Sequence, residues 1–298
     1  MTHDQHISRR WSGDWARKSA GPAPVVDVLV PTANRPAELA VTLAGLAAQD
    51  DPPFRITLSD QSEGSPDWAA PATAAMVRVL EAQGREVRLR RNLPRRGLAQ
   101  QRDSLLQTAT APEVLFLDDD VWLEPGSLAR LHRALGELEC GFVGSAVQGL
   151  SFIDQVRPQE RTTFELWSGP VLPEGIGRDS PAFARWPLHN AANLVHEASE
   201  YSLAPDDYLA YKVAWVGGCV LFDRQKLVTS GGFGFWRDLP VNHAGEDVVA
   251  QWRVMGMFGG AGILPSGAVH LESPTTVTDR DVEAIDLIAS TTVDRSDF

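Results

Sequence analysis

Three consecutive carboxylates, Asp118, Asp119 and Asp120, form the densest acidic cluster in the sequence, and they directly follow four apolar residues. Adjacent carboxylates repel one another, so such a cluster is costly unless a cation lies beside it. In an extended segment the first and third side chains share one face, so Asp118 and Asp120 can share a ligand. Oxygen ligands of this kind suit Mg²⁺ or Mn²⁺ bound to a diphosphate, and the alternative is an acidic surface turn.

Two further acidic positions could carry chemistry. Glu246 and Asp247 open a predicted helix after Gly245. A carboxylate there could act as a general base toward a hydroxyl, or it could simply complement the helix dipole. Asp60 ends a predicted strand within Ser-Asp-Gln-Ser. Its carboxylate could accept the N–H of a pyrimidine base or bond a ribose hydroxyl, or it could begin a turn.

Basic residues supply candidate contacts to an anion. Arg102 lies inside a predicted helix otherwise rich in Ala and Leu, and Gly97 precedes that helix. A helix N-terminus favours an anion, so this is a candidate phosphate site. Asn34 and Arg35 follow the first predicted strand, where the guanidinium could reach a base or a phosphate. His270 ends a late strand, and as a lone histidine it is more often structural than a metal ligand.

Several classes of protein are excluded or disfavoured. No G-x-G-x-x-G follows the first strand and no G-x-x-x-x-G-K-[ST] occurs, so dinucleotide-binding and P-loop sites are disfavoured. Cys140 and Cys219 lie in apolar runs without a C-x-x-C motif, which favours buried free thiols over a disulfide or a zinc site. The net charge of −12 argues against nucleic acid as a partner, because phosphate binding needs a positive face.

The elements that must position these residues alternate along the first half. Strands are predicted at 25–30, 54–58, 86–90, 113–117 and 141–147, and helices at 38–49, 71–83, 97–108 and 125–138. This alternation predicts an α/β fold, a mostly parallel central sheet with helices on both faces. Ligands bind at the carboxyl ends of the strands in such sheets. The polar clusters follow three of these strands, so we expect them to meet at one edge.

The second half is less regular. Residues 150–210 predict loops and short elements that could close over a substrate. After them the pattern predicts a strand at 213–222 broken by Gly217-Gly218, a helix at 245–257, a strand at 263–269 and a helix at 279–288. The expected organisation is therefore an arm at 1–24, a regular part at 25–148, a less regular part at 149–275, and a tail at 276–298.

Targeting signals are not evident. Residues 1–24 have no apolar core typical of a signal peptide, and no apolar run is long enough to span a membrane. We expect a cytoplasmic protein with at most peripheral contact at the inner membrane face, made through the basic and aromatic residues of the arm. The sequence does not predict the oligomeric state.

Taken together, the motifs resemble the family-2 glycosyltransferases with a GT-A fold, over residues 25–270. The first half reads V-P-T-x-N-R-P, S-D-Q-S, R-G-L-A-x-x-R-[ND] and F-L-D-D-D-V-x-x-x-P-G-x-L, and the second half reads G-G-F, G-E-D-V and a closing His. Each fragment alone is weak, and their order makes the set specific. Ser-Asp-Gln-Ser departs from the commoner Asp-Asp-Gly-Ser, and the Gln/Arg/Trp signature of processive polysaccharide synthases is not met.

The resemblance implies roles for individual residues. It implies a nucleotide-sugar pocket formed by Pro31, Thr32, Asn34, Arg35, Asp60, Gly97, Arg102, Asp118 and Asp119. It implies metal contacts at Asp120 and His270, for Mg²⁺ or Mn²⁺. It implies a catalytic base at Asp247 with Glu246 beside it, and a sugar and acceptor site shaped by Trp215, Gly217 and Gly218.

The implied activity is hexosyl transfer with inversion. The donor would be a nucleotide-diphosphate sugar, with a UDP- or dTDP-sugar favoured, and the acceptor a carbohydrate, lipid-linked or small-molecule hydroxyl in polysaccharide or glycoconjugate biosynthesis. Two alternatives stay open. One is a non-catalytic nucleotide-sugar-binding protein of the same fold. The other is a sugar-1-phosphate nucleotidyltransferase, which is disfavoured because no Gly-rich loop follows the first strand.

Overall fold

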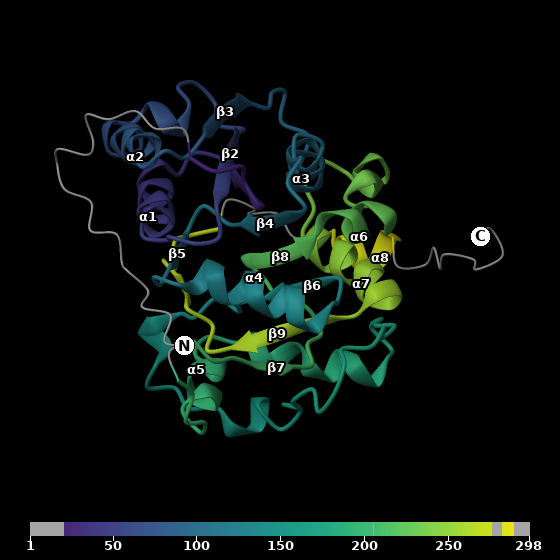
Figure 1. The fold of residues 1–298 in the computed structure, drawn as a ribbon. Coiled ribbons are helices and arrows are strands. Elements are labelled where there is room, and N and C mark those ends of the chain that lie inside the picture. The colour runs from purple at the N-terminus through teal and green to yellow at the C-terminus, as the bar shows by residue number, and fades with distance from the viewer. Residues whose placement is uncertain (1–20, 205, 276–281, 289–298) are drawn as a thin grey trace.

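The computed structural model describes residues 21–204, 206–275 and 282–288 of the 298-residue chain. Most of the predicted arm and tail therefore lies outside the described residues. Figure 1 shows a central sheet with helices packed on its two faces. The strands lie in the order β3 (Val87–Arg91), β2 (Phe54–Asp60), β1 (Val26–Thr32), β4 (Glu113–Leu117), β8 (Cys219–Asp223), β6 (Phe142–Gly144), β9 (Gly260–Leu264) and β7 (Leu209–Tyr211).

The helices surround this sheet. They are α1 (Pro36–Ala47), α2 (Pro71–Ala82), α3 (Leu98–Leu106), α4 (Ser127–Leu138), α5 (Asn193–Ala198), α6 (Arg224–Thr229), α7 (Glu246–Phe258) and α8 (Ala284–Ile288). A separate pair joins β10 (Ala268–His270) to β5 (Val121–Leu123). Short 3₁₀ turns, among them η2 (Asp67–Ala69) and η5 (Pro181–His189), fill much of the connecting chain. No helix among the described residues is both long and apolar enough to cross a membrane.

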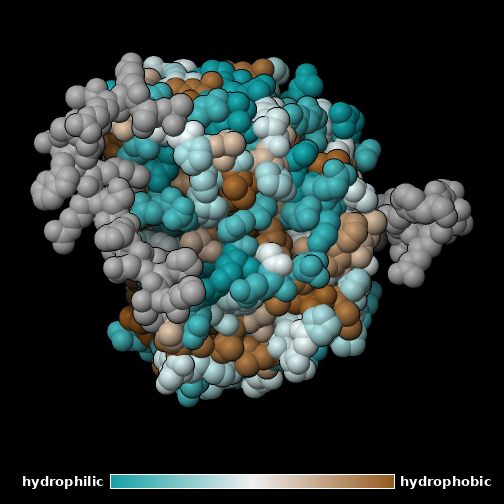
Figure 2. Space-filling model, in the orientation of Figure 1, coloured by the Kyte–Doolittle hydropathy of each residue, from teal (hydrophilic) through white to brown (hydrophobic). Residues whose placement is uncertain are grey.

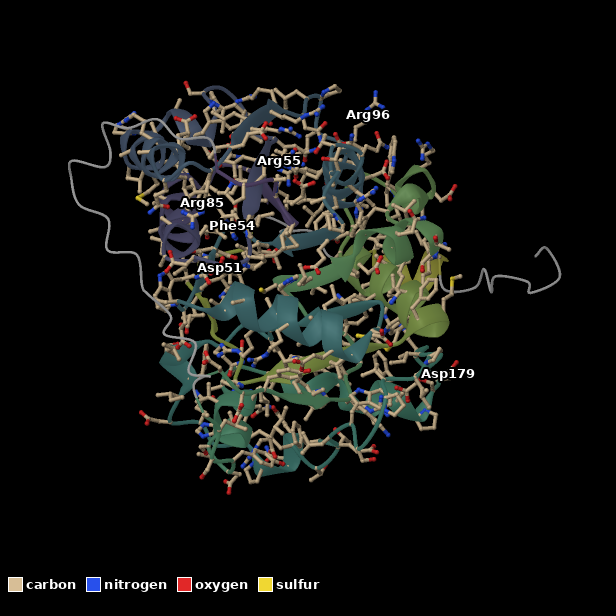
Figure 3. The ribbon with its side chains drawn as sticks, in the orientation of Figure 1. Asp51, Phe54, Arg55, Arg85, Arg96 and Asp179 are labelled. Carbon is tan, nitrogen blue, oxygen red and sulfur yellow. The ribbon has the colours of Figure 1, made fainter. Side chains whose placement is uncertain are left out.

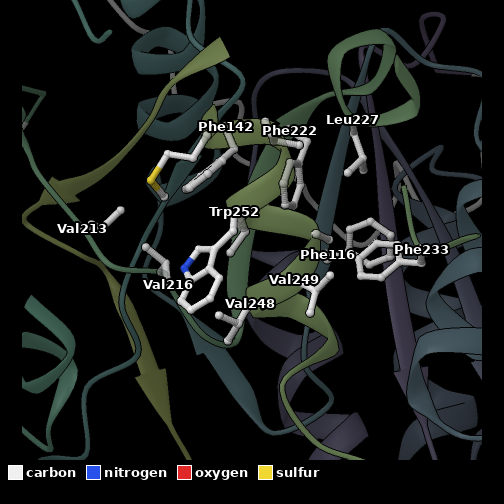
Figure 4. Packing of buried hydrophobic residues seen from close by; sticks show 14 of the residues in the cluster. Phe116, Phe142, Val213, Val216, Phe222, Leu227, Phe233, Val248, Val249 and Trp252 are labelled. Atoms are coloured by element: carbon white, nitrogen blue, oxygen red, sulfur yellow. The ribbon is translucent and has the colours of Figure 1, made fainter. Parts of the chain in front are cut away.

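The strand β1 shows why the core has two sides. All seven of its residues are buried. Val28 packs in the cluster that includes residues of α1, α2 and α4, whereas Leu29 packs in the cluster that includes residues of α3 and α7. Successive strand residues face opposite sides, so a continuous apolar run is the pattern of a sheet covered on both faces. Figure 4 shows the second cluster, where the indole of Trp252 lies near Val216 and Val248.

The register of the first half brings the predicted site together. β1 pairs in parallel with β2 and with β4, and Thr32 lies opposite Asp60. The carboxyl ends of these three strands therefore meet at one edge, and Asp118 is the residue that directly follows β4. The prediction of an α/β fold with polar residues gathered at this edge is confirmed.

Several predicted boundaries are wrong. The strand expected at 213–222 begins only at Cys219, because Gly218 has a φ of 76° that bends the chain out of extended geometry. The strand expected at 141–147 ends at Gly144. The strand expected at 263–269 is two strands, since a turn with Gly267 at a φ of 68° separates β9 from β10. Of the helix expected at 279–288, residues 284–288 are helical, and 279–281 lie outside the described residues.

The directions of the strands β7 and β8 were also not predicted. β8 runs antiparallel between β4 and β6, and β7 runs antiparallel beside β9, while the other strands of the sheet run in one direction. The sheet is therefore mostly parallel but mixed, and strands from both halves of the chain share it. On the face drawn in Figure 2, hydrophilic residues dominate the upper part, and hydrophobic residues gather lower down, near where 149–211 lies in Figure 1.

Candidate active site

A buried arginine joins the two acidic clusters. Arg102 on α3 is only 4% exposed. Its Nη2 donates to Asp118 Oδ1 at 2.9 Å, and its Nε donates to Glu246 Oε1 at 2.9 Å. Burial alone would lower the pKa of Arg102, but the neighbouring carboxylates Asp118, Glu246 and Asp247 outweigh it and raise that pKa. The guanidinium is thus permanently charged and holds α7 against the end of β4.

The same contacts separate the roles of Glu246 and Asp247. Glu246 is 3% exposed, and its carboxylate is paired with the guanidinium of Arg102. Asp247 lines a small cavity together with Arg102, Gly218 and Gln251. Burial, followed by the charge of Glu246, raises the pKa of Asp247 to about 7, against the opposing charge of Arg102. A carboxylate poised near neutrality is suited to take up a proton.

The acidic cluster lines a second, larger cavity of about 280 Å³. This cavity is lined by Pro31, Thr32, Ala33, Arg35, Leu98, Gln101, Asp118, Asp119, Asp120, His270, Ser273 and Thr275. Seven of the predicted site residues, from three separate stretches of sequence, therefore meet around one space. Asn34 is not among them: it is exposed, and its backbone N–H donates to Ser62 Oγ at 2.8 Å.

The three carboxylates have different surroundings. The side chain of Asp118 is 36% exposed, whereas those of Asp119 and Asp120 are nearly buried against Arg35. Burial raises the pKa of Asp119 to about 7. Burial, and then the charge of Asp118, also raises the pKa of Asp120, although His270 and Arg35 oppose this. The crowding of charge expected from the sequence is thus present, and Arg35 partly neutralises it.

The donor set fits a hard divalent cation only with help from a substrate. In the part of the chain that the structure describes, no three His, Cys, Asp or Glu side chains converge closely enough to hold a metal ion alone. Mg²⁺ and Mn²⁺ are commonly held by one or two carboxylates with phosphate oxygens completing the shell. Asp118 and Asp120 face the cavity and supply such oxygens.

His270 is oriented as a donor. Its Nδ1 accepts the backbone N–H of Glu272 at 2.8 Å, so a neutral ring carries its proton on Nε2. Nε2 lies 3.4 Å from Asp120 Oδ2. In this arrangement the imidazole faces the carboxylate with an N–H, and a metal would need the other tautomer.

Asp60 orders the loop after β2. Its side chain is fully buried, and its two oxygens accept the backbone N–H groups of Ser62 and Asp67, each at 2.6 Å. Asp67 Oδ2 in turn accepts the hydroxyl of Thr32 at 2.7 Å and the backbone N–H of Arg35 at 3.0 Å. A direct contact between Asp60 and a base would require this loop to open. The sequence did not indicate Asp67, whose only signal is an acidic residue at the start of a turn after Pro66.

Gly97 and His243 connect α3 to the loop before α7. Gly97 has a φ of 90°, and a Cβ there would lie 2.6 Å from His243 Cε1. His243 Nε2 accepts the N–H of Ala99 at 3.2 Å, while Nδ1–H donates to the Pro240 carbonyl at 2.7 Å. One N–H of the first turn of α3 is therefore occupied by the protein, which narrows the anion site expected there. His243 was not indicated by the sequence, because its partner is 144 residues away.

The segment before β8 lines the smaller cavity through Val216 and Gly218. Gln251 is fully buried, and its amide both accepts the N–H of Val216 and donates to its carbonyl, each at 2.8 Å. The Gly218 carbonyl accepts the N–H of Asp118 at 2.9 Å. The predicted sugar and acceptor residues Trp215, Gly217 and Gly218 therefore lie in a segment bonded to α7 on one side and to the acidic cluster on the other.

Comparisons with known proteins agree with this geometry. The model of the family described as "Glycosyl transferase family 2" matches residues 27–180. Among solved structures, the mannosyltransferase PcManGT from Pyrobaculum calidifontis, in complex with GDP-Man and Mn²⁺, aligns with a TM-score of 0.54 at 19% identity, over 89% of this chain and 64% of that one. TarS 1–349 of S. aureus aligns with a TM-score of 0.51 at 16% identity, over 82% of this chain and 60% of that one.

These likenesses confirm the predicted fold class, a GT-A sheet with helices on both faces. The chain spans less than two thirds of the length of either structure. None of the curated proteins matches it.

Proposed function

Because this chain belongs to glycosyltransferase family 2, we propose that it transfers a sugar from a nucleotide-diphosphate sugar to an acceptor hydroxyl. The observation that carries the proposal is the position of Arg102. It contacts the acidic cluster through Asp118 and the helix of the candidate base through Glu246. One buried cation thus sets a candidate donor site beside a carboxylate with a pKa near 7.

The donor is proposed to occupy the 280 Å³ cavity. Pro31, Thr32 and Asp118 would contact the nucleoside, and Asp60 would act by ordering the loop that carries Asp67. The GDP-Man and Mn²⁺ bound to PcManGT support a nucleotide sugar together with a divalent cation. A UDP- or dTDP-sugar was favoured from Asp60, but its buried side chain no longer supports that preference, so the base is the first thing to measure.

Asp120 is the proposed metal ligand, with Asp118 beside it and a diphosphate completing the shell. When bound, Mg²⁺ or Mn²⁺ would neutralise the departing nucleoside diphosphate. His270 is proposed to steady Asp120 through the Nε2–H that faces its carboxylate, since that is how its ring is oriented. Gly97, whose missing Cβ would face His243, would act by setting the position of α3, which carries Arg102.

Asp247 is the proposed general base. It would take the proton from the attacking hydroxyl, which bonds to the anomeric carbon on the face opposite the leaving group and inverts that centre. Glu246 would hold Arg102 rather than exchange protons. Trp215, Gly217 and Gly218 would shape the space between donor and base. In this scheme residues 25–148 provide most of the donor contacts, and residues 149–275 provide the base, the acceptor contacts and His270 of the donor cavity.

Isothermal titration tests the donor site. UDP, GDP and dTDP are each titrated into the protein with Mn²⁺ and with EDTA, and the series is repeated on Asp120→Ala. We expect one nucleotide to bind in a Mn²⁺-dependent way and the variant to lose that dependence. Glu124→Ala, which removes an exposed charge four residues further on, is the control and is expected to bind as the wild type does. Absence of binding for all three nucleotides would refute the donor site.

A further inference from the structure

We propose that Arg35 is the resident counter-ion of the acidic cluster and that it competes with the divalent cation for Asp120. This inference rests on the proposed donor site and adds a property to it. The site would hold one cation at a time on these carboxylates, either the guanidinium of the chain or the metal.

The contacts of Arg35 place its charge within the carboxylate cluster. Nη1 donates to Asp120 Oδ2 at 2.5 Å and to Asp119 Oδ1 at 3.2 Å. Nη2 donates to the carbonyl of Pro274, in the segment that follows β10. All three side chains of this group are nearly buried, with 6–11% of each exposed. A single guanidinium thus supplies a positive charge to two carboxylates in a poorly solvated site, where an uncompensated charge is costly.

The backbone of Arg35 is fixed while its side chain has room to move. The backbone N–H donates to Asp67 Oδ2 at 3.0 Å, and Pro36 begins α1 directly afterwards. The guanidinium lines the open cavity. A change of side-chain rotamer could therefore release Asp120 without moving the fold.

A metal ion and Arg35 would need the same nearly buried carboxylate, that of Asp120. Mg²⁺ lies about 2.0–2.1 Å from a carboxylate oxygen, closer than any hydrogen-bond donor. Nη1 already lies at hydrogen-bond distance from Asp120 Oδ2, and His270 Nε2 lies 3.4 Å from the same atom. Two cations held at one carboxylate repel strongly where water is scarce. Metal binding to Asp120 therefore requires Arg35 to withdraw.

If Arg35 competes with the metal, removing it should change the metal affinity in the opposite direction from removing a residue that supports metal binding. If Arg35 merely held the metal site in shape, its removal would weaken metal binding. If it competes, its removal leaves Asp119 and Asp120 without a counter-ion and strengthens metal binding. In EDTA the guanidinium stays paired with Asp119 and Asp120, and its charge offsets their repulsion of a diphosphate.

The experiment measures the weak Mn²⁺ binding expected of the carboxylates without nucleotide, from the electron paramagnetic resonance signal of free Mn²⁺ over a range that extends to high metal concentration. Arg35→Met is compared with the wild type and with Arg90→Met, which removes an exposed arginine from β3 and so controls for net charge. We expect Arg35→Met to bind Mn²⁺ roughly tenfold more tightly, a coupling of ordinary size between two sites. Arg90→Met should match the wild type, and Arg35→Met/Asp120→Ala should lose the gain.

Arg35→Lys keeps the experiment decisive if Arg35→Met does not fold. Lysine retains the charge but lacks the fork that reaches Asp119, Asp120 and Pro274 together. It should therefore fold and bind Mn²⁺ more tightly than the wild type by a smaller factor. Equal or weaker Mn²⁺ binding in a folded Arg35 variant, or no Mn²⁺ binding in any of them, would overturn the competition.

Nucleotide binding in EDTA separates this inference from the donor site itself. The wild type should retain weak binding of the preferred nucleotide without metal, and Arg35→Met should lose it. If the wild type binds no nucleotide under any condition, the donor site fails. If it binds nucleotide with Mn²⁺ while Arg35→Met shows no tighter Mn²⁺ binding, the donor site stands and only the competition fails.

Discussion

Glu246 and Asp247 are neighbours in sequence with opposite surroundings. The carboxylate of Glu246 is buried and forms an ion pair with Arg102, whereas Asp247 lines a cavity and its pKa is raised to about 7. Sites that use two carboxylates in different acid–base roles typically place them in different environments, which give them different pKa values. This contrast supports the proposal that Glu246 orients Arg102 and that Asp247 exchanges protons.

This division predicts the pH profile of the reaction. A general base works deprotonated, so kcat/KM should rise with pH and level off above about 7, the raised pKa of Asp247. The charge of Glu246 contributes to that raised pKa, so Glu246→Gln should lower it and move the acid limb to lower pH. Initial rates from pH 5 to 9 measure both effects. Glu137→Gln on α4, with the same loss of charge at an exposed position, should leave the limb in place. A limb that does not move in Glu246→Gln would contradict the assignment.

At the scale of elements, α3 and the loop before α7 meet at Gly97. The positive φ of this residue and its approach to His243 leave no space for a side chain. Since α3 carries Arg102, the packing at Gly97 sets where the guanidinium lies relative to both acidic clusters.

Gly97→Ala should be more destabilising than an ordinary glycine replacement. A side chain in the left-handed region costs about 1–2 kcal/mol, and here the new Cβ would also lie 2.6 Å from the Val241 carbonyl and from His243. Gly126→Ala is the control for an added Cβ at positive φ in open space, since its φ is 84° and nothing lies within 4 Å of the added Cβ, while its ψ is −5° against 167° at Gly97. Urea denaturation measures the free energy of unfolding of both. Equal losses would mean that the loop accommodates the side chain and does not fix α3.

How far the sequence predicts the elements depends on how local their cause is. The strand at Glu113–Leu117 was predicted with its exact ends, because an apolar run and the acidic cluster bound it. The direction of β8 was not predicted, because pairing partners 100 residues apart leave no mark in a local pattern. β5 and β7 were missed because each has only three residues.

The candidate site follows the same rule. Residues in runs of one chemical type, such as Asp118 to Asp120, were recognised from the sequence, and the structure places them around one cavity. Asp67, His243 and Gln251 were not recognised. Each acts through hydrogen bonds to backbone 32 to 144 residues away, and only the folded chain brings those partners within reach.

At the scale of the whole molecule, the two ends of the sheet have different tasks. The site occupies the carboxyl ends of β1 and β4, while the opposite end is fixed by a buried ion pair. Asp27 is 1% exposed, accepts Arg55 Nε at 2.7 Å, and also accepts the backbone N–H groups of Thr110 and Ala111 at 2.6 and 2.9 Å. Figure 3 labels Arg55 on β2, near Phe54 and the Arg85 side chain that lies 4.5 Å from the centre of that ring.

Asp27→Ala should therefore reduce stability and leave the site intact. Removing one partner of a buried pair typically costs about 3–5 kcal/mol, because the other charge stays buried. Denaturant unfolding should show a loss of this size, while the folded fraction binds its preferred nucleotide with unchanged affinity. Reduced affinity without a loss of stability would mean that the two ends of the sheet are coupled.

The central claim, that Asp247 is the base beside a separate donor site, is tested most directly by Asp247→Asn. Nucleotide affinity is measured by titration, and turnover by release of the nucleoside diphosphate from the preferred donor with a panel of sugar acceptors. We predict unchanged donor affinity and a loss of kcat of about 10²–10⁴-fold, the usual contribution of a general base. Turnover within a few-fold of the wild type, or an equal loss of donor affinity, would contradict the account.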